Sequence, residues 1–226
     1  MKNCIFCHYS NKSIIPNYVL YYIEILKPKF NIHLLTNVRE IDNLDILEEL
    51  NVDIYFYNNE GMDFGMYYKF LSDNDITGDT LIINDSVILF NSLDNILEEV
   101  LNSKEDLVGL TSSNEISYHI QSYFWYLKSD VFEIFKDYLR KEGIKKDYDT
   151  IVHIYEIGFN NIIVNNGYNT KAIFEYIDDK NPTIHHPIEI IKHIPIIKKK
   201  IYSRYLDIIR GNKSETLNLN FLLEDI

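Results

Sequence analysis

The sequence is poor in the residues that mark disulfide-rich, collagen-like and low-complexity proteins. Its 226 residues include only 2 cysteines, 8 glycines and 5 prolines. So few glycines and prolines exclude collagen-like and low-complexity chains. Two cysteines cannot build a disulfide framework, which fits a reducing compartment, and we expect a cytoplasmic protein. No apolar run reaches the roughly 18 residues that a membrane-spanning helix needs.

Basic residues are also in the minority. The chain carries 22 Lys and Arg against 34 Asp and Glu, a formal net charge of −12. We therefore expect no nucleic-acid partner, because a polyanion would be repelled, although a local site could still bind a small anion. Hydrophobic residues make up 46% of the chain, so it can bury a sizeable core as a globular domain.

Both cysteines, Cys4 and Cys7, fall in a short apolar segment that has the pattern of a first strand. A Cys-x-x-Cys pair could serve redox or zinc chemistry, but a redox pair needs its first thiol at a helix N-terminus, where the pKa is lowered. Free cysteine is among the residues most often buried. We therefore predict that both cysteines are buried in a strand.

Strand-like and helix-like segments alternate through the first half of the chain. This rhythm predicts an α/β fold, with a mostly parallel sheet covered by helices on both faces. Ligands of such sheets bind at the carboxyl ends of the strands, so polar residues that follow a strand are candidates for the site. The strands are expected at 3–8, 32–36, 52–57, 80–83 and 107–110, and the helices at 14–27, 41–50, 63–71 and 92–101.

The second half has a different pattern. The segment 119–127 alternates and is aromatic, which predicts one further strand. We expect a single domain, 1–226, that ends in a helical C-terminal extension from residue 188, broken or kinked at Pro195. Two helices are expected at 130–140 and 150–165, and a short edge strand at 171–174.

Two constellations follow predicted strands. In Asn59-Glu60-Gly61-Met62-Asp63-Phe64-Gly65, the glycines would let backbone approach a ligand, and the helix start offers free N–H groups to an anion. Asp63 could instead be a plain helix N-cap. In Asn84-Asp85-Ser86, the carboxylate could bind a divalent cation that neutralises a diphosphate, or the segment could be an ordinary Asn-Asp turn. Neither pattern is a Walker loop or a Rossmann fingerprint.

These constellations and four later segments occur in an order that resembles one enzyme family. The later segments are Val108-Gly109-Leu110-Thr111, His119-Ile120-Gln121-Ser122-Tyr123-Phe124, Tyr155-Glu156-Ile157-Gly158 with Gly167-Tyr168, and Asn181-Pro182-Thr183 with Pro195-Ile196-Ile197-Lys198. Together they resemble the rhamnan-synthesis F type of glycosyltransferases, nucleotide-sugar enzymes of the GT-A fold. The resemblance implies a GT-A-like mixed, mostly parallel sheet. It further implies a nucleotide-sugar-binding half, 1–111, an acceptor half, 112–187, and a helical tail, 188–226.

The resemblance implies that Asp85 holds a metal ion and the donor diphosphate. Only Asp85 is charged in Asn84-Asp85-Ser86, a departure from the family's Asp-x-Asp element, so a further ligand is needed. His185 or His186 could supply it, although adjacent histidines in a loop are usually surface residues. Carboxylate and imidazole together favour Mn²⁺ over Mg²⁺.

The resemblance also assigns a base and donor residues. Glu156 would be the base of an inverting transfer, with Asp149 and Glu115 as weaker alternatives, or it could be an ordinary solvated glutamate of a helix. The donor would be bound by His8, Tyr9, Ser10, Asn59, Gly61, Asp63, Asn84 and Ser86, although Tyr9 could equally pack in the core. Gln121, Tyr123 and Trp125 alternate along one face of the predicted strand, where aromatic and amide groups could bind the acceptor or form a buried aromatic ladder.

The expected function is transfer of a hexose or deoxyhexose from a UDP-, GDP- or dTDP-sugar to a glycan or lipid-linked glycan. The basic segment 192–204, interleaved with isoleucines, could contact an anionic membrane peripherally, or pack its isoleucines onto the core. A nucleotidyltransferase is one alternative, but His8-Tyr9-Ser10-Asn11-Lys12 lacks the glycines that its triphosphate loop needs. A non-catalytic nucleotide-sugar-binding module is another.

Overall fold

The computed structural model describes residues 2–215, 217–224 and 226. In this part of the chain eight strands form one mixed sheet, in the order β3-β2-β1-β4-β8-β6-β7, with β9 paired to β6. The pairs β3–β2, β2–β1, β1–β4 and β6–β9 are parallel, which confirms the predicted fold class. The strands are β1 (Lys2–His8), β2 (Phe30–Thr36), β3 (Asp53–Phe56), β4 (Thr80–Asn84), β6 (Leu107–Ser113), β7 (His119–Ile120), β8 (Phe124–Leu127) and β9 (Thr170–Phe174).

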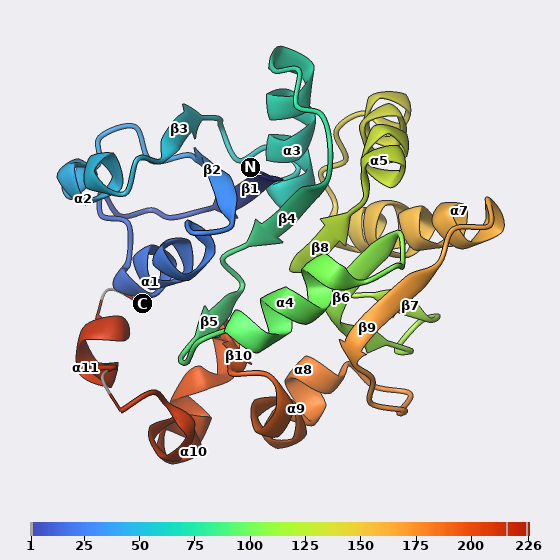
Figure 1. Cartoon of the computed structure of the whole chain (residues 1–226). Helices are drawn as coiled ribbons and strands as arrows, with labels where there is room; N and C mark the ends of the chain where they lie inside the picture. The colour runs from blue at the N-terminus through green and yellow to red at the C-terminus, as the bar shows by residue number, and fades with distance from the viewer. Residues whose placement is uncertain (1, 216, 225) are drawn as a thin grey trace.

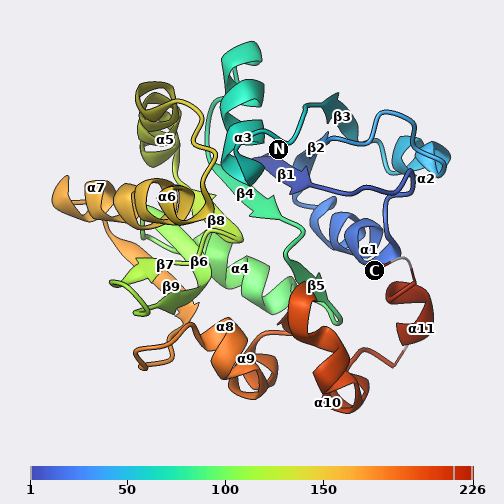
Figure 2. The ribbon, with the colours of Figure 1, turned by 180° about the vertical axis from the view of Figure 1, so that it is seen from behind.

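Helices cover both faces of the sheet (Figure 1). One face packs against α1 (Asn17–Leu26) and α4 (Asp94–Asn102), and α2 (Leu44–Glu49) connects β2 to β3. The other face packs against α3 (Met62–Asp73), α5 (Ser129–Glu142) and α7 (Phe159–Asn165), as Figure 2 shows from behind. Strands β2, β1 and β4 are parallel neighbours, so the loops that follow them lie at the same edge of the sheet.

Strand β1 shows why this sheet is central to the core. Cys4 and Phe6 pack on one face, whereas Ile5 and Cys7 pack on the other, and all four are 0% exposed. A strand whose alternate side chains are all apolar must be covered on both faces. The prediction that both cysteines are buried in a strand is confirmed.

The aromatic segment 119–127 is not a single strand, contrary to the prediction. Strand β6 lies between β7 and β8 and pairs antiparallel with both. The chain therefore passes from one edge of β6 to the other at residues 121–123. The helix predicted at 150–165 is one continuous helical segment that consists of α6 (Tyr148–Ile151), the π-helical η1 (Val152–Gly158) and α7.

The C-terminal segment is only partly helical, so this prediction needs correction. Strand β10 (Ile196–Lys198) pairs antiparallel with β5 (Val87–Leu89), a strand that the sequence did not reveal. Pro195 ends the preceding helix. The other elements are α8 (Pro182–His185), α9 (Pro187–His193), the 3-10 helix η2 (Lys199–Tyr205), α10 (Leu206–Asn212) and α11 (Leu219–Leu222).

The same pairing removes the basis of the predicted membrane contact. Ile194, Ile196 and Ile197 are at most 2% exposed and belong to the core beside α1 and α4. The apolar side of this segment is therefore already covered by protein. In the described residues, no helix combines the length and the apolar character that crossing a membrane requires.

Candidate functional site

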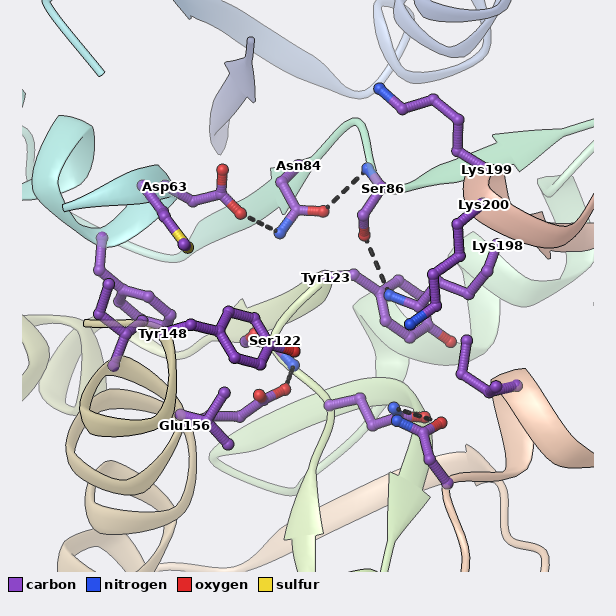
Figure 3. A pocket seen from close by; sticks show the side chains of 17 residues that line it. Asp63, Asn84, Ser86, Ser122, Tyr123, Tyr148, Glu156, Lys198, Lys199 and Lys200 are labelled. Carbon is purple, nitrogen blue, oxygen red and sulfur yellow. Dashed lines mark hydrogen bonds between the residues drawn. The ribbon is translucent and has the colours of Figure 1, made fainter. Parts of the chain in front are cut away.

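A cavity of about 370 Å³ opens at the carboxyl end of β4 (Figure 3). Its walls come from the start of α3, the β4–β5 turn, the turn between β7 and β8, the helical segment α6–η1, and the β10–η2 junction. These elements span residues 62–200 of the chain. The cavity thus lies where a sheet of this topology is expected to bind a ligand.

Side chains of the β4–β5 turn alternate in direction. Asn84 and Ser86 line the cavity, whereas Asp85 between them does not. All three lysines of the β10–η2 segment line the cavity, but Lys198 and Lys200 point into it, whereas the Lys199 ammonium is turned away from its centre (Figure 3) and lies 2.8 Å from Asp85 Oδ2. Asp85 and Ser86 form a tight turn and Lys199 begins the 3-10 helix η2, and these two adjacent segments present two separate sets of side chains.

The set that faces away from the cavity is a buried polar network around Asp85. Its Oδ2 atom accepts hydrogen bonds from His8 Nδ1 at 2.9 Å, Tyr18 Oη at 2.9 Å and Lys199 Nζ at 2.8 Å. Burial alone would raise the pKa of Asp85, but the His8 hydrogen bond and the Lys199 charge outweigh burial and lower it. Asp85, 7% exposed, therefore stays ionised inside the protein. Its predicted position in the donor site is wrong.

The described residues do not fit the predicted Mn²⁺ site. Nowhere in the described chain do three His, Cys, Asp or Glu side chains gather as metal ligands. His185 is exposed and His186 pairs with Asp178 and packs on the Tyr176 ring, and neither histidine lines the cavity. Asp85 already has an ammonium group at the distance of a direct ion pair.

The set that faces the cavity includes two ammonium groups. Lys198 Nζ donates to Ser86 Oγ at 3.0 Å and lies 4.5 Å from the centre of the Tyr123 ring. Burial lowers the pKa of Lys198 to about 8, although Glu156 and Asp63 raise it and Lys200 lowers it further. Among the described residues, no carboxylate forms an ion pair with Lys198 or Lys200. Two like charges thus share the cavity.

Asp63 lies across the cavity from the lysines, in the first turn of α3. Its Oδ2 atom accepts a hydrogen bond from Asn84 Nδ2 at 2.6 Å. Burial raises its pKa to about 6, as does the charge of Asp85, while Cys7 and Lys198 oppose the rise. Asp63 does not act as a side-chain cap of its helix, since α3 begins after Gly61 without one. A cavity carboxylate with a pKa near neutrality is a candidate for binding and proton transfer.

Glu156 is the second carboxylate in the cavity, and η1 carries it there. Its Oε1 atom accepts a hydrogen bond from the Ser122 backbone N–H at 2.8 Å, and its side chain is 17% exposed. His119 Nε2 lies 4.0 Å from the same oxygen. A π-helical turn often marks a functional site, because the wider turn redirects a side chain. The structure thus brings Glu156 to the cavity, and its role as a base stays a prediction.

The residues predicted on the nucleoside side are not in this cavity. His8 is 1% exposed and bonded to Asp85, Tyr9 is 48% exposed, and Ser10 is fixed by Asn37. None of the three lines the cavity.

The glycine constellation has mainly a packing role. Gly61 has φ +82°, and a Cβ there would lie 2.6 Å from Ile144 Cγ2. At Gly65 a Cβ would lie 1.7 Å from the Glu60 carbonyl oxygen. Asn59 is exposed, and neither it nor Gly61 lines the cavity. These glycines let the helix start pack tightly, and Asp63 lines the cavity together with its neighbours Met62 and Phe64.

The predicted acceptor residues divide into two groups. Gln121 and Tyr123 line the cavity, and both bond to Thr111 Oγ1, at 2.7 Å each. Trp125 is 0% exposed, packs among the aromatic rings beneath α5 and α7, and donates from Nε1 to the Ile120 carbonyl oxygen. The acceptor role of Trp125 is therefore wrong, and the core alternative holds for this residue.

Sequence reasoning missed the residues that come from distant segments. Lys198 and Lys200 were assigned to a surface helix, and Tyr148 and Asn181 were given no role, but all four line the cavity. Asp85 and Ser86 form a turn after β4, and local sequence carried no signal for which of the two side chains would enter the cavity.

Comparison with known families decides the relationship of the chain. The family model described as rhamnan synthesis protein F matches residues 35–226. The chain belongs to the rhamnan synthesis protein F family. The matched range contains all the residues that line the cavity. A comparison with curated proteins finds no match.

Solved structures share the fold of this rhamnan synthesis protein F family member. A Bacillus anthracis protein, solved with sucrose and named as a glucose-1-phosphate thymidylyltransferase, has a TM-score of 0.56 at 13% identity, covering 98% of this chain and 99% of its own. HddC from Yersinia pseudotuberculosis has a TM-score of 0.52 at 12% identity, and the match covers 94% of this chain and 100% of HddC. CTP:phosphocholine cytidylyltransferase from Streptococcus pneumoniae has a TM-score of 0.52 at 12% identity, and the match covers 94% of this chain and 99% of that protein. At these identities, the likeness concerns the fold alone.

Proposed function

We propose that this protein is a glycosyltransferase that moves a hexose or deoxyhexose from a nucleoside-diphosphate sugar to a glycan or lipid-linked glycan. The observation that carries the proposal is a cavity in which the ammonium groups of Lys198 and Lys200 lie across from the carboxylates of Asp63 and Glu156 (Figure 3). A sugar diphosphate needs cations at its phosphates and hydrogen-bond acceptors at its hydroxyl groups. The membership of the rhamnan synthesis protein F family supports a role in polysaccharide synthesis.

The reaction would proceed by direct displacement. Glu156 would take the proton from an acceptor hydroxyl as its oxygen bonds to the anomeric carbon, and the bond from that carbon to the diphosphate oxygen would break. The electron pair leaves with the diphosphate, whose developing charge the ammonium groups would stabilise. Asp63, held by Asn84, would accept hydrogen bonds from donor hydroxyls. This arrangement gives inversion at the anomeric carbon.

Acceptor binding fits the opposite wall of the cavity. Tyr148 is 61% exposed and lines the cavity beside Glu156, so its ring is accessible to a sugar. Gln121 supplies an amide whose Nε2 already bonds to Asn181 Oδ1 at 3.1 Å. An exposed aromatic face with amide groups alongside suits a carbohydrate, which has apolar faces and hydroxyl edges.

Nucleotidyl transfer is the second candidate function, because the solved structures with the same fold include nucleotidyltransferases. The loop after β1 weighs against it. His8 is buried against Asp85 there, and the following residues Tyr9-Ser10-Asn11-Lys12 contain no glycine to wrap a triphosphate.

The product distinguishes these functions. The purified chain is incubated with UDP-, GDP- and dTDP-sugars and a glycan acceptor panel, and with nucleoside triphosphates and sugar 1-phosphates in parallel. Release of a nucleoside diphosphate supports glycosyl transfer, whereas release of pyrophosphate from a triphosphate refutes it in favour of nucleotidyl transfer. A raised melting temperature with a nucleotide sugar, without any product, would refute it in favour of a binding module.

A further inference from the structure

Two consecutive lysines of the β10–η2 segment contact two consecutive residues of the β4–β5 turn, one on each side of the paired backbones. On the outer side, Lys199 Nζ lies 2.8 Å from Asp85 Oδ2. On the cavity side, Lys198 Nζ lies 3.0 Å from Ser86 Oγ. The backbone holds both contacts in register, because the Lys199 N–H donates to the Ser86 carbonyl oxygen at 2.9 Å and Lys198 pairs with Val87.

The outer pair neutralises the acid that the resemblance assigned to a metal ion. Asp85 Oδ2 accepts three hydrogen bonds, and one of the donors is a cation. To bind a divalent cation, this carboxylate would have to break its ion pair and expose an ammonium group in the same place. Two cations within contact distance of one another repel strongly when partly buried. The Lys199 ammonium thus supplies, beside Asp85, the positive charge that a metal ion would otherwise supply.

On the cavity side, Lys198 and Lys200 form no direct ion pair among the described residues, although Glu156 and Asp63 in the same cavity favour the charged form of Lys198. Lys198 is held by Ser86 Oγ and by the Tyr123 ring, both uncharged, and the charge of Lys200 disfavours its protonated form. A half-buried ammonium group without a directly contacting carboxylate is stabilised by an anionic ligand. A diphosphate has several acceptor oxygens, enough to accept hydrogen bonds from both ammonium groups.

We propose that Lys198 and Lys200 bind the diphosphate of the donor without a divalent cation, while Lys199 neutralises Asp85. The identity of the ligand as a donor diphosphate rests on the proposed function. Ser86 and Tyr123 fix Lys198, which limits the rotamer freedom that binding would otherwise remove. The lysines contribute the positive charge that a bound metal ion supplies at a leaving diphosphate.

The test uses inorganic pyrophosphate as the probe and calorimetric titration of the full chain in excess EDTA. Wild-type protein should bind pyrophosphate in EDTA, and added Mn²⁺ should change its Kd by less than about threefold. A change of that size is smaller than the factor in Kd that one charge-assisted hydrogen bond contributes. Lys198→Met and Lys200→Met should each weaken binding about tenfold, as expected for loss of such a bond. Lys198→Arg keeps the charge and should bind nearly as the wild type does.

Lys104→Met is the matched control, because Lys104 is an exposed lysine that does not line the cavity. It should bind pyrophosphate as the wild type does, and circular dichroism shows whether each variant is folded. The proposal is overturned if wild-type binding requires Mn²⁺. It is equally overturned if folded Lys198→Met and Lys200→Met proteins bind with unchanged Kd.

The proposed function can fail separately. Pyrophosphate binding in EDTA without turnover of any nucleotide sugar would refute glycosyl transfer and support the lysine site. Transfer that occurs only with Mn²⁺ would support glycosyl transfer and refute the metal-free lysine site. Transfer in EDTA that is lost in Lys198→Met would support both.

Discussion

Lys199 donates a hydrogen bond of 2.8 Å to Asp85, a residue 114 positions earlier in the chain. This contact links the C-terminal segment to the end of β4, in the middle of the sheet. It also turns the carboxylate away from the cavity, so the ion pair determines which residues of both segments remain available to a ligand. Lys198 and Lys200 remain on one segment, and Asn84 and Ser86 on the other.

The Asp85–Lys199 pair should be measurable in a double-mutant cycle. We expect Asp85→Asn to lower the free energy of unfolding by about 3 kcal/mol, because His8 and Lys199 lose a buried charged partner. Lys199→Met should cost less, since its side chain is 33% exposed. The double variant should lose less than the sum of the two, as residues in contact do. Additive losses in urea denaturation would show that the pair has no coupling energy.

Glu156→Gln should lower kcat by about 10²–10⁴-fold, the usual contribution of a general base. Donor binding should change little, because the Ser122 N–H can still donate to the amide oxygen at the position of Oε1. Glu98→Gln, on the exposed side of α4, is the matched control and should keep full activity. Initial rates and donor titrations measure both quantities. Unchanged kcat in folded Glu156→Gln protein would exclude this residue as the base.

Asp63 should make stability depend on pH with a defined sign. Its pKa is about 6 in the folded protein, above its ordinary value of 3.8, so the unfolded chain holds fewer protons between these pH values. Its contribution to stability is therefore full below pH 3.8 and is lost as the pH rises through about 6.

The variant Asp63→Asn isolates this effect. It removes the buried charge yet keeps an acceptor for Asn84 Nδ2, so we expect a gain of about 1–3 kcal/mol at pH 7, an order-of-magnitude figure for such a shift. Near pH 4 the gain should vanish. Donor turnover should fall at the same time, since a carboxylate of the site is lost. Urea denaturation at both pH values checks the sign, and a gain that is equal at both would contradict it.

Gly65→Ala should destabilise the fold rather than alter ligand binding directly. A Cβ at this position would lie 1.7 Å from the Glu60 carbonyl oxygen, so the start of α3 must shift. We expect a loss of about 1–3 kcal/mol or more, as in other overpacked sites. Gly211→Ala is the control, because its Cβ would meet nothing within 4 Å. Thermal denaturation should show a lower Tm only for Gly65→Ala.

Much of the sheet follows from local pattern. The segments 3–8, 32–36 and 80–83 are apolar runs bounded by polar residues, and each lies within an observed strand. Short runs of this kind are buried on both faces of a parallel sheet, so the fold class needs no information beyond the sequence. The strand β5 was missed because three apolar residues that directly follow a turn do not show a period.

The site was only partly predictable, because local pattern does not show which distant segments meet. Asp63 follows from its own segment, as a polar residue at a helix start after a predicted strand, whereas Glu156 was assigned through the family resemblance. Trp125 was misassigned because alternation places a residue on one face of a strand without saying whether that face meets solvent or core.

The sequence by itself determined the alternating α/β architecture and the burial of the first strand. These depend on the periods of neighbouring residues, which local chemistry dictates. Only the tertiary structure decided that Asp85 faces inward and that two lysines of the C-terminal segment enter the cavity. The physical reason is the antiparallel pairing of β5 with β10, two strands that lie more than a hundred residues apart in the chain. The register of this pairing sets which lysine lies beside Asp85 and which lysines point into the cavity.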